Sequence, residues 1–172
     1  MTNWADRKKD FNGCGLPVVT LPDGSQLAES IPTSIYYGKK FGQYPRDPAV
    51  AHTMESLLTA FPEVFGALGA AHFSKDNNKI ASSINEKADA YIAKLEPILK
   101  KSKFLCGDTL TVVDFWVGAM YCDLATNAAN DNKVTLATWA AVLRKYPNFK
   151  RFGEDFKREN ADWLNKRAPH AV

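Results

Sequence analysis

Residues 104–115 read FLCGDTLTVVDF, and this stretch predicts the start of the central helix of the protein. Thr111 and Asp114 have the spacing of a capping box, in which the N-cap side chain accepts from the N3 backbone N–H and the N3 side chain accepts from the N-cap N–H. Leu110 and Phe115 flank the box with the spacing of a hydrophobic staple. The residues that follow are apolar on nearly every side, so we expect this helix to lie in the middle of a bundle.

Helical patterns extend on both sides of this stretch. Asp47 followed by Pro48 is a typical helix start, because Asp caps the N-terminus and Pro lacks only an N–H that would have no partner there. The apolar spacing predicts helices over residues 48–73, 79–101, 111–126, 136–145, 148–158 and 161–166.

The N-terminal part has a different texture. Residues 16–21 and 26–29 are expected to form two strands joined by a turn at 22–25. Ser30 is expected to be the N-cap of a helix over 31–40. We therefore predict two domains, residues 1–43 and 44–172, and a fold that is mostly α and α+β overall.

Composition excludes several classes of function. The chain has 172 residues and a net charge of +3, and its basic residues are spread out, which argues against a nucleic-acid partner. Three cysteines without a CxxC motif favour a reducing compartment, and we expect the cytoplasm. The three histidines are far apart, so no metal site is expected. No apolar stretch is long enough for a membrane span.

The run from Phe104 to Phe115 resembles the start of the buried helix in the cytosolic glutathione S-transferases (GSTs). The segments 16–19 (LPVV), 23–24 (DG) and 27–30 (LAES) are similar to the glutathione-binding hairpin of that family. Trp4, Lys8 and the ending at 161–169 most resemble the sigma branch. The resemblance implies a GST-type helical C-terminal domain preceded by a partial thioredoxin-like β-hairpin–helix unit.

The same resemblance implies a binding site for glutathione, which would be a co-substrate or ligand, and no other cofactor. It assigns Trp4, Lys8, Leu16, Pro17, Glu29 and Ser30 to this site, with a cis peptide bond before Pro17. The backbone of Leu16 would pair with the cysteinyl part, Ser30 and Glu29 would bind the γ-glutamyl carboxylate and ammonium groups, and Lys8 would pair with the glycyl carboxylate. Each residue also has a purely structural interpretation, as a helix cap, a surface charge or a packing group.

The expected activity is conjugation of glutathione to a hydrophobic electrophile, with an apolar subsite near Phe61, Phe65 and the C-terminal segment. The family's thiol-stabilising Tyr, Ser or Cys has no match in this sequence, which looks N-terminally shortened relative to the family. No catalytic residue is therefore assigned, and weak or absent thiol activation is expected. The alternative is a non-catalytic structural or assembly subunit with the same fold. The strand at 16–21 would have an unpaired edge, which a second copy or a protein partner could cover.

Overall fold

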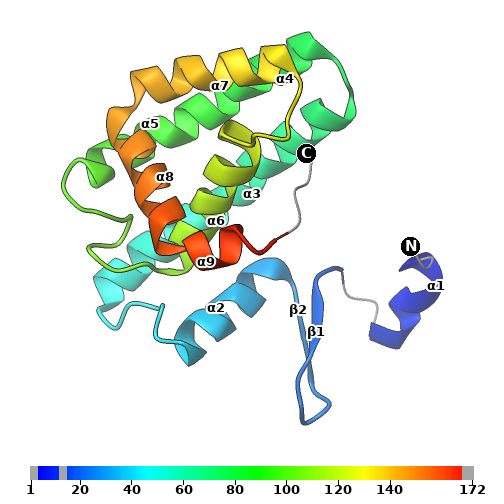
Figure 1. Cartoon of the computed structure of the whole chain (residues 1–172). Helices are drawn as coiled ribbons and strands as arrows, with labels where there is room; N and C mark the ends of the chain where they lie inside the picture. The colour runs from blue at the N-terminus through cyan, green and yellow to red at the C-terminus, as the bar shows by residue number, and fades with distance from the viewer. Residues whose placement is uncertain (1–3, 12–14, 168–172) are drawn as a thin grey trace. The chain divides into compact units, whose positions relative to one another are not determined.

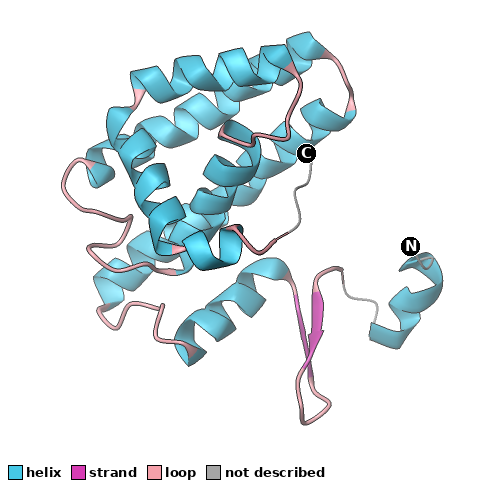
Figure 2. Ribbon diagram, viewed as in Figure 1, coloured by secondary structure: helices cyan, strands magenta, loops and turns pink. Residues whose placement is uncertain are grey.

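The computed structural model describes residues 4–11 and 15–167. The chain divides into two compact units, Met1–Tyr44 and Pro45–Val172, and each is described here by itself. The described residues are mostly helical, with one small antiparallel sheet (Figure 2). The predicted fold class, a helical domain preceded by a partial thioredoxin-like unit, is confirmed.

The first unit contains a hairpin and a helix. After the short helical segments α1 (Trp4–Arg7) and η1 (Lys8–Phe11), strand β1 (Val18–Thr20) pairs with β2 (Gln26–Ala28). Val18 lies opposite Ala28 in this antiparallel pair. Gly24, at φ 84°, supplies the left-handed backbone that the turn requires, and the Asp23 carboxylate accepts from the Ser25 N–H at 2.9 Å. Both strands lie inside their predicted ranges and are shorter.

Helix α2 (Ser30–Lys40) follows the hairpin directly, as Figure 1 shows. The prediction of Ser30 as the N-cap is wrong by one residue. Glu29 holds the cap position, with φ 67° and ψ 129°, and its carbonyl oxygen accepts the first helical hydrogen bond from the Thr33 N–H at 3.1 Å. Ser30 is therefore the first helical residue.

The second unit is helical throughout its regular structure. Its elements are α3 (Pro48–Phe73), α4 (Asn77–Ser83), η2 (Ile84–Ala88), α5 (Asp89–Leu99), α6 (Val112–Ala119), η3 (Met120–Ala125), α7 (Lys133–Lys145), α8 (Pro147–Glu159) and α9 (Ala161–Leu164). Segments η2 and η3 are π-helical, so each wider turn continues the α-helix before it. The predicted helices are all present, with most ends shifted by a few residues, and α3 begins and ends at the predicted residues.

Helix α6 lies in the interior of this unit and packs against α3 and α8 (Figure 1). Val113 and Val117 of α6 are fully buried. Gly118 faces the Phe156 ring and Gly153 faces the Tyr121 ring so closely that an added Cβ would lie 2.6 Å and 2.3 Å from those rings. The predicted central position of this helix is confirmed.

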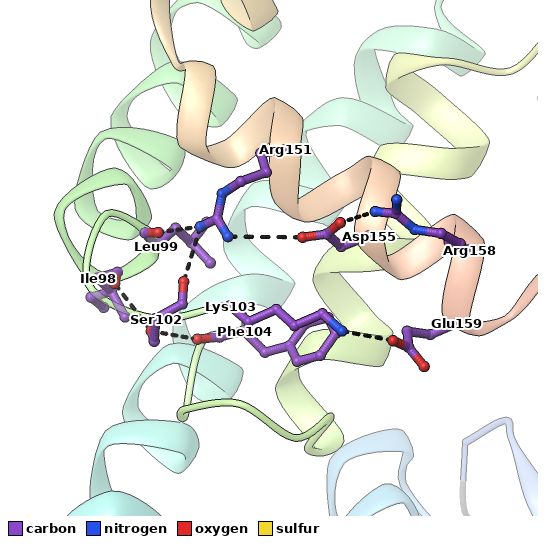
Figure 3. A network of polar contacts seen from close by, with 9 residues as sticks. All are labelled: Ile98, Leu99, Ser102, Lys103, Phe104, Arg151, Asp155, Arg158 and Glu159. Carbon is purple, nitrogen blue, oxygen red and sulfur yellow. Dashed lines mark hydrogen bonds and ion pairs between the residues drawn. The ribbon is translucent and has the colours of Figure 1, made fainter.

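A polar network attaches the segment before α6 to α8, as Figure 3 shows. Arg151 donates to the carbonyl oxygens of Leu99 and Ser102, the second at 2.9 Å, and Lys103 pairs with Glu159 at 2.7 Å. The Ser102 hydroxyl donates to the Phe104 carbonyl oxygen at 2.7 Å. These contacts with α8 therefore fix the position of the segment that leads into α6. Across residues 4–11 and 15–167, no helix has the length and apolar character needed to cross a membrane.

Candidate functional site

The exposed segment before β1 is the first part of the candidate site. The Leu16–Pro17 peptide bond is cis, as the resemblance implies. The strand ladder begins at Val18, so Leu16 lies outside it, and the Leu16 side chain is 64% exposed. An extended peptide can therefore approach the backbone of Leu16 from solvent.

The end of the hairpin places Glu29 and Ser30 beside this segment. A Cβ built on Gly15 would lie 3.9 Å from Oε1 of Glu29, so the carboxylate reaches the residue just before Leu16. Ser30 begins a helix of 11 residues, whose first N–H groups favour an anion. The structure thus brings Leu16, Pro17, Glu29 and Ser30 together, with an acid and a helix N-terminus as neighbours.

Trp4 and Lys8 precede this cluster on separate helical segments. Trp4 is the first residue of α1, and Lys8 is an exposed residue of η1. Residues 12–14 connect η1 to the hairpin and lie outside the described residues, as does the Cys14 thiol that the sequence places before Leu16. The roles of Trp4 and Lys8 toward a ligand remain predictions.

The described thiols and the Tyr121 hydroxyl are not activated groups. Burial raises the pKa of Cys106, and it raises the pKa of Cys122 to about 11. The Tyr121 hydroxyl donates to Glu154 at 2.5 Å, and burial is the main reason that its pKa is raised. Tyr36 and Tyr37 form an edge-to-face pair with ring centroids 5.3 Å apart on α2. Among the described residues, no group of three or more His, Cys, Asp or Glu side chains could hold a metal ion.

An aromatic hollow lies in the helical unit near Phe61 and Phe65, where the apolar subsite is expected. We call it the α3–α6 hollow, and it is a cavity of about 340 Å³ lined by Phe61, Phe65, Phe115, Trp116 and Ala119. The Phe61 ring stacks on Phe65 at 5.8 Å and meets Trp116 edge to face at 5.6 Å. Its lining can bind a flat apolar molecule, because it offers aromatic faces and almost no polar group.

Phe115 and Trp116 were not predicted as lining residues. The sequence assigned them only to the central helix; Val112, Val113 and Asp114 before them are buried, whereas Phe115 and Trp116 are half-buried. The sequence held no clear signal for this, because the predicted helix is apolar on nearly every side.

The capping box fixes the direction in which Phe115 and Trp116 point. Oδ2 of Asp114 accepts from the N–H and from the hydroxyl of Thr111, both at 2.8 Å, and Oδ1 accepts from the Leu105 N–H at 2.8 Å. Burial nevertheless raises the pKa of Asp114, because desolvation outweighs these donors. The box predicted from the sequence is confirmed and also ties Leu105 to α6.

Residues 63–167 match the family model of the glutathione S-transferase C-terminal domain. The chain belongs to the glutathione S-transferase family. The match covers most of the helical unit, including Phe65, Phe115 and Trp116, and it does not include the hairpin. The assignment of the hairpin residues therefore rests on their geometry and on their resemblance.

Similar proteins agree with this family. A curated relative, glutathione S-transferase PM239X14 of Arabidopsis thaliana, is 27% identical in an alignment of 155 residues, which covers 77% of this chain and 69% of that protein. The glutathione S-transferase Na-GST-3 of the hookworm Necator americanus has a TM-score of 0.77 at 20% identity, covering 98% of this chain and 82% of that one. Rat hPGDS complexed with a quinoline has a TM-score of 0.78 at 14% identity, covering 100% of this chain and 83% of that one. At these identities the two structures show that the fold is shared.

Proposed function

We propose that this member of the GST family binds glutathione at the hairpin of its first domain, for which we propose residues 1–43. The observation that supports this most is the position of the Glu29 carboxylate and the Ser30 helix N-terminus beside the cis Leu16–Pro17 segment. The Leu16 backbone would pair with the cysteinyl part of the tripeptide. Glu29 would bind its ammonium group and Ser30 its γ-glutamyl carboxylate.

Two further residues complete the proposed site. Lys8, an exposed cation, would pair with the glycyl carboxylate, and Trp4 would pack alongside it. Their spacing before the hairpin supports this assignment, and so does their resemblance to the sigma branch.

We also propose that the α3–α6 hollow binds the second substrate, an apolar electrophile. In the reaction, the glutathione sulfur forms a bond to an electrophilic carbon, the leaving group departs from that carbon, and the thiol proton passes to water. The aromatic lining supports a flat substrate, and rat hPGDS, which shares the fold, was solved with a quinoline, a flat two-ring compound.

For the chain of this sequence, we expect weak thiol activation. Free thiols have a pKa of about 8.5 and need a hydrogen bond or a positive potential to form thiolate at neutral pH. Among residues 1–172, no Tyr, Ser or Cys was matched to the family's position for this role. The second candidate function is a non-catalytic structural or assembly subunit. Among the described strands, β1 pairs only with β2. The other edge of β1 can therefore pair with a second copy or a partner protein, which favours this candidate. For either function we propose a cytoplasmic homodimer or complex.

Calorimetric titration with glutathione tests the binding site. We expect saturable heat from the chain, about ten-fold weaker binding by Ser30→Ala and by Glu29→Gln, and an unchanged affinity for the matched hairpin control Ser25→Ala. No heat at millimolar glutathione, or equal affinities in all three variants, would remove the proposed site.

A conjugation assay with 1-chloro-2,4-dinitrobenzene then separates the two functions. Turnover that Phe65→Ala reduces and Phe73→Ala does not would support an enzyme with its electrophile at the α3–α6 hollow. Both residues are exposed phenylalanines of α3, which makes them a matched pair. Glutathione binding without turnover would support the non-catalytic function.

A further inference from the structure

Tyr91 joins helix α5 to the turn of α3 that carries Phe61. Its side chain is 3% exposed, and its hydroxyl donates to the backbone carbonyl oxygen of Leu57 at 2.9 Å. Its ring meets the Phe61 ring edge to face, with centroids 5.8 Å apart. Leu57 and Phe61 are one helical turn apart, so a single side chain of α5 holds both ends of this turn of α3.

The turn that Tyr91 holds comes directly before Pro62, which lies inside α3. Proline has no N–H, so the Leu58 carbonyl cannot receive its usual helical hydrogen bond, and the proline ring crowds that carbonyl. The turn before Pro62 therefore lacks one hydrogen bond of a regular α-helix. The Tyr91 hydroxyl donates a hydrogen bond from another helix at this point.

Phe61 transmits this constraint to the α3–α6 hollow. The Phe61 ring is 2% exposed, stacks on Phe65 and meets Trp116 edge to face at 5.6 Å, and all three residues line the hollow. A closely packed ring cannot shift without moving its neighbours. The position of the turn at Phe61 therefore determines where the aromatic faces of the hollow lie.

The Tyr91 hydroxyl keeps its proton. Burial raises the pKa of Tyr91 above its ordinary value of 10.0. The hydroxyl is therefore a hydrogen-bond donor at neutral pH, and it is not suited to act as a base there. Its contribution is to hold the backbone of α3 in position.

We propose that Tyr91 is a positioning residue for the apolar electrophile, because its hydroxyl fixes the α3 turn that carries Phe61 and so sets the shape of the α3–α6 hollow. This inference rests on the proposed function, which assigns the hollow to the electrophile. Loss of the hydroxyl should therefore weaken binding of the electrophile and leave glutathione binding unchanged.

Tyr91→Phe tests this assignment, because it removes the hydroxyl and keeps the ring. The matched control is Tyr146→Phe. Tyr146 is also buried, and its hydroxyl donates at 3.0 Å to Asp89, which is not among the residues that line the hollow. Urea denaturation should show a similar loss of stability in the two variants, since each loses one hydroxyl hydrogen bond.

The first measurement uses the ¹⁵N-labelled full-length chain without ligand. The indole N–H signal of Trp116 is assigned with Trp116→Phe. Because Trp116 contacts the Phe61 ring, we expect this signal to move in Tyr91→Phe and to stay in place in Tyr146→Phe. An unmoved signal in Tyr91→Phe, or an equal movement in the control, would overturn the proposal.

The second measurement is calorimetry with glutathione and with S-(2,4-dinitrophenyl)glutathione, the conjugate of 1-chloro-2,4-dinitrobenzene. We expect Tyr91→Phe to bind the conjugate about five-fold more weakly than the unaltered chain does, with an unchanged affinity for glutathione. In the conjugation assay, the KM for the electrophile should rise by a similar factor while kcat stays the same. Equal weakening of both ligands, or a conjugate affinity equal to that of Tyr146→Phe, would overturn the proposal.

A failure of the proposed function gives a different result. The unaltered chain would then show no heat with glutathione, whereas the Trp116 signal would still report whether Tyr91 holds the turn at Phe61. A moved Trp116 signal together with selective weakening of the conjugate would support both the hollow and its positioning residue.

Discussion

The two units differ in how they are stabilised. All the buried hydrophobic side chains among the described residues lie in the second unit, from Ala51 onward. The described part of the first unit buries only Thr33 and Gly38. The first unit instead exposes Leu16 and holds Glu29 at a positive φ. The comparison indicates that apolar burial in the helical unit supplies most of the folding free energy. The hairpin unit instead leaves an apolar side chain exposed, where a ligand or a partner can contact it.

The largest expected effect on stability is at Asp114. Asp114→Ala leaves the buried N–H groups of Leu105 and Thr111 without their acceptor, so we expect a loss of about 4 kcal/mol in the free energy of unfolding. Urea denaturation followed by circular dichroism measures it. A loss as small as that of an exposed hairpin variant such as Ser25→Ala would contradict the contrast between the units.

Asp114 also predicts a pH dependence. Because burial raises its pKa, the folded state holds the proton more tightly than the unfolded state does, whose ordinary value is 3.8. The free energy of unfolding should therefore fall as the pH rises from that value through the raised folded pKa. Asp114→Asn lacks this fall, and urea denaturation of both proteins across this pH range checks it.

Cys122 should react very slowly in the folded chain. A free cysteine with a pKa of about 8.5 is about one quarter thiolate at pH 8, whereas a pKa of about 11 leaves about 0.1% as thiolate. We expect alkylation by iodoacetamide about 200-fold slower than in guanidinium, rising about ten-fold per pH unit below pH 10. Mass spectrometry of the Cys122 peptide measures the rate, and equal rates in both solvents would contradict the burial of this thiol.

A smaller effect is expected from glycines in the second unit. Gly153→Ala places a methyl group against the buried Tyr121 ring and should cost about 2 kcal/mol. The control is Gly66→Ala in α3, where the added methyl meets nothing and should stabilise the helix by about 0.7 kcal/mol. Thermal unfolding of the two variants gives the comparison, and a neutral Gly153→Ala would show that this core is loosely packed.

The smallest effect is expected in the hairpin unit, with the opposite sign. Glu29→Gly removes a side chain from a backbone conformation that favours glycine, so we expect a gain of about 1 kcal/mol. Hydrogen exchange of the Thr33 amide, which donates to the Glu29 carbonyl, reports on it locally. If Glu29→Gly gains local stability and loses glutathione binding, the Glu29 side chain serves the ligand and not the fold. A loss of local stability would contradict this assignment.

Polar side chains that cap helix N-termini made helix starts predictable from the sequence. The Asp47 carboxylate accepts from the N–H groups of Ala49 and Val50 at 2.9 and 3.0 Å, which explains why α3 begins at the predicted residue. Asn132 was overlooked as a cap, although it accepts from the Thr135 N–H at 3.0 Å and starts α7 before the predicted Leu136. Where a polar side chain meets the backbone locally, the sequence contains the signal.

Other features depend on packing between distant segments and had no local signal. The positive φ of Glu29 moved the helix cap away from Ser30, and no residue type at that position indicated it. The π-helical turns at 84–88 and 120–125 keep nearly the same apolar spacing as an α-helix. The cavity between α6, α8 and α9 depends on how Trp163 lies against Phe115 and Phe156, which the sequence of α9 alone does not determine.

The most direct test of the central claim follows the backbone amides of the hairpin unit by NMR during titration with glutathione. If glutathione binds there, the amide signals of Leu16 and Ser30 shift saturably together, while those of the turn residues Gly24 and Ser25 stay in place. Saturable shifts confined to the helical unit, or none in either unit at millimolar glutathione, would contradict a glutathione site on this hairpin.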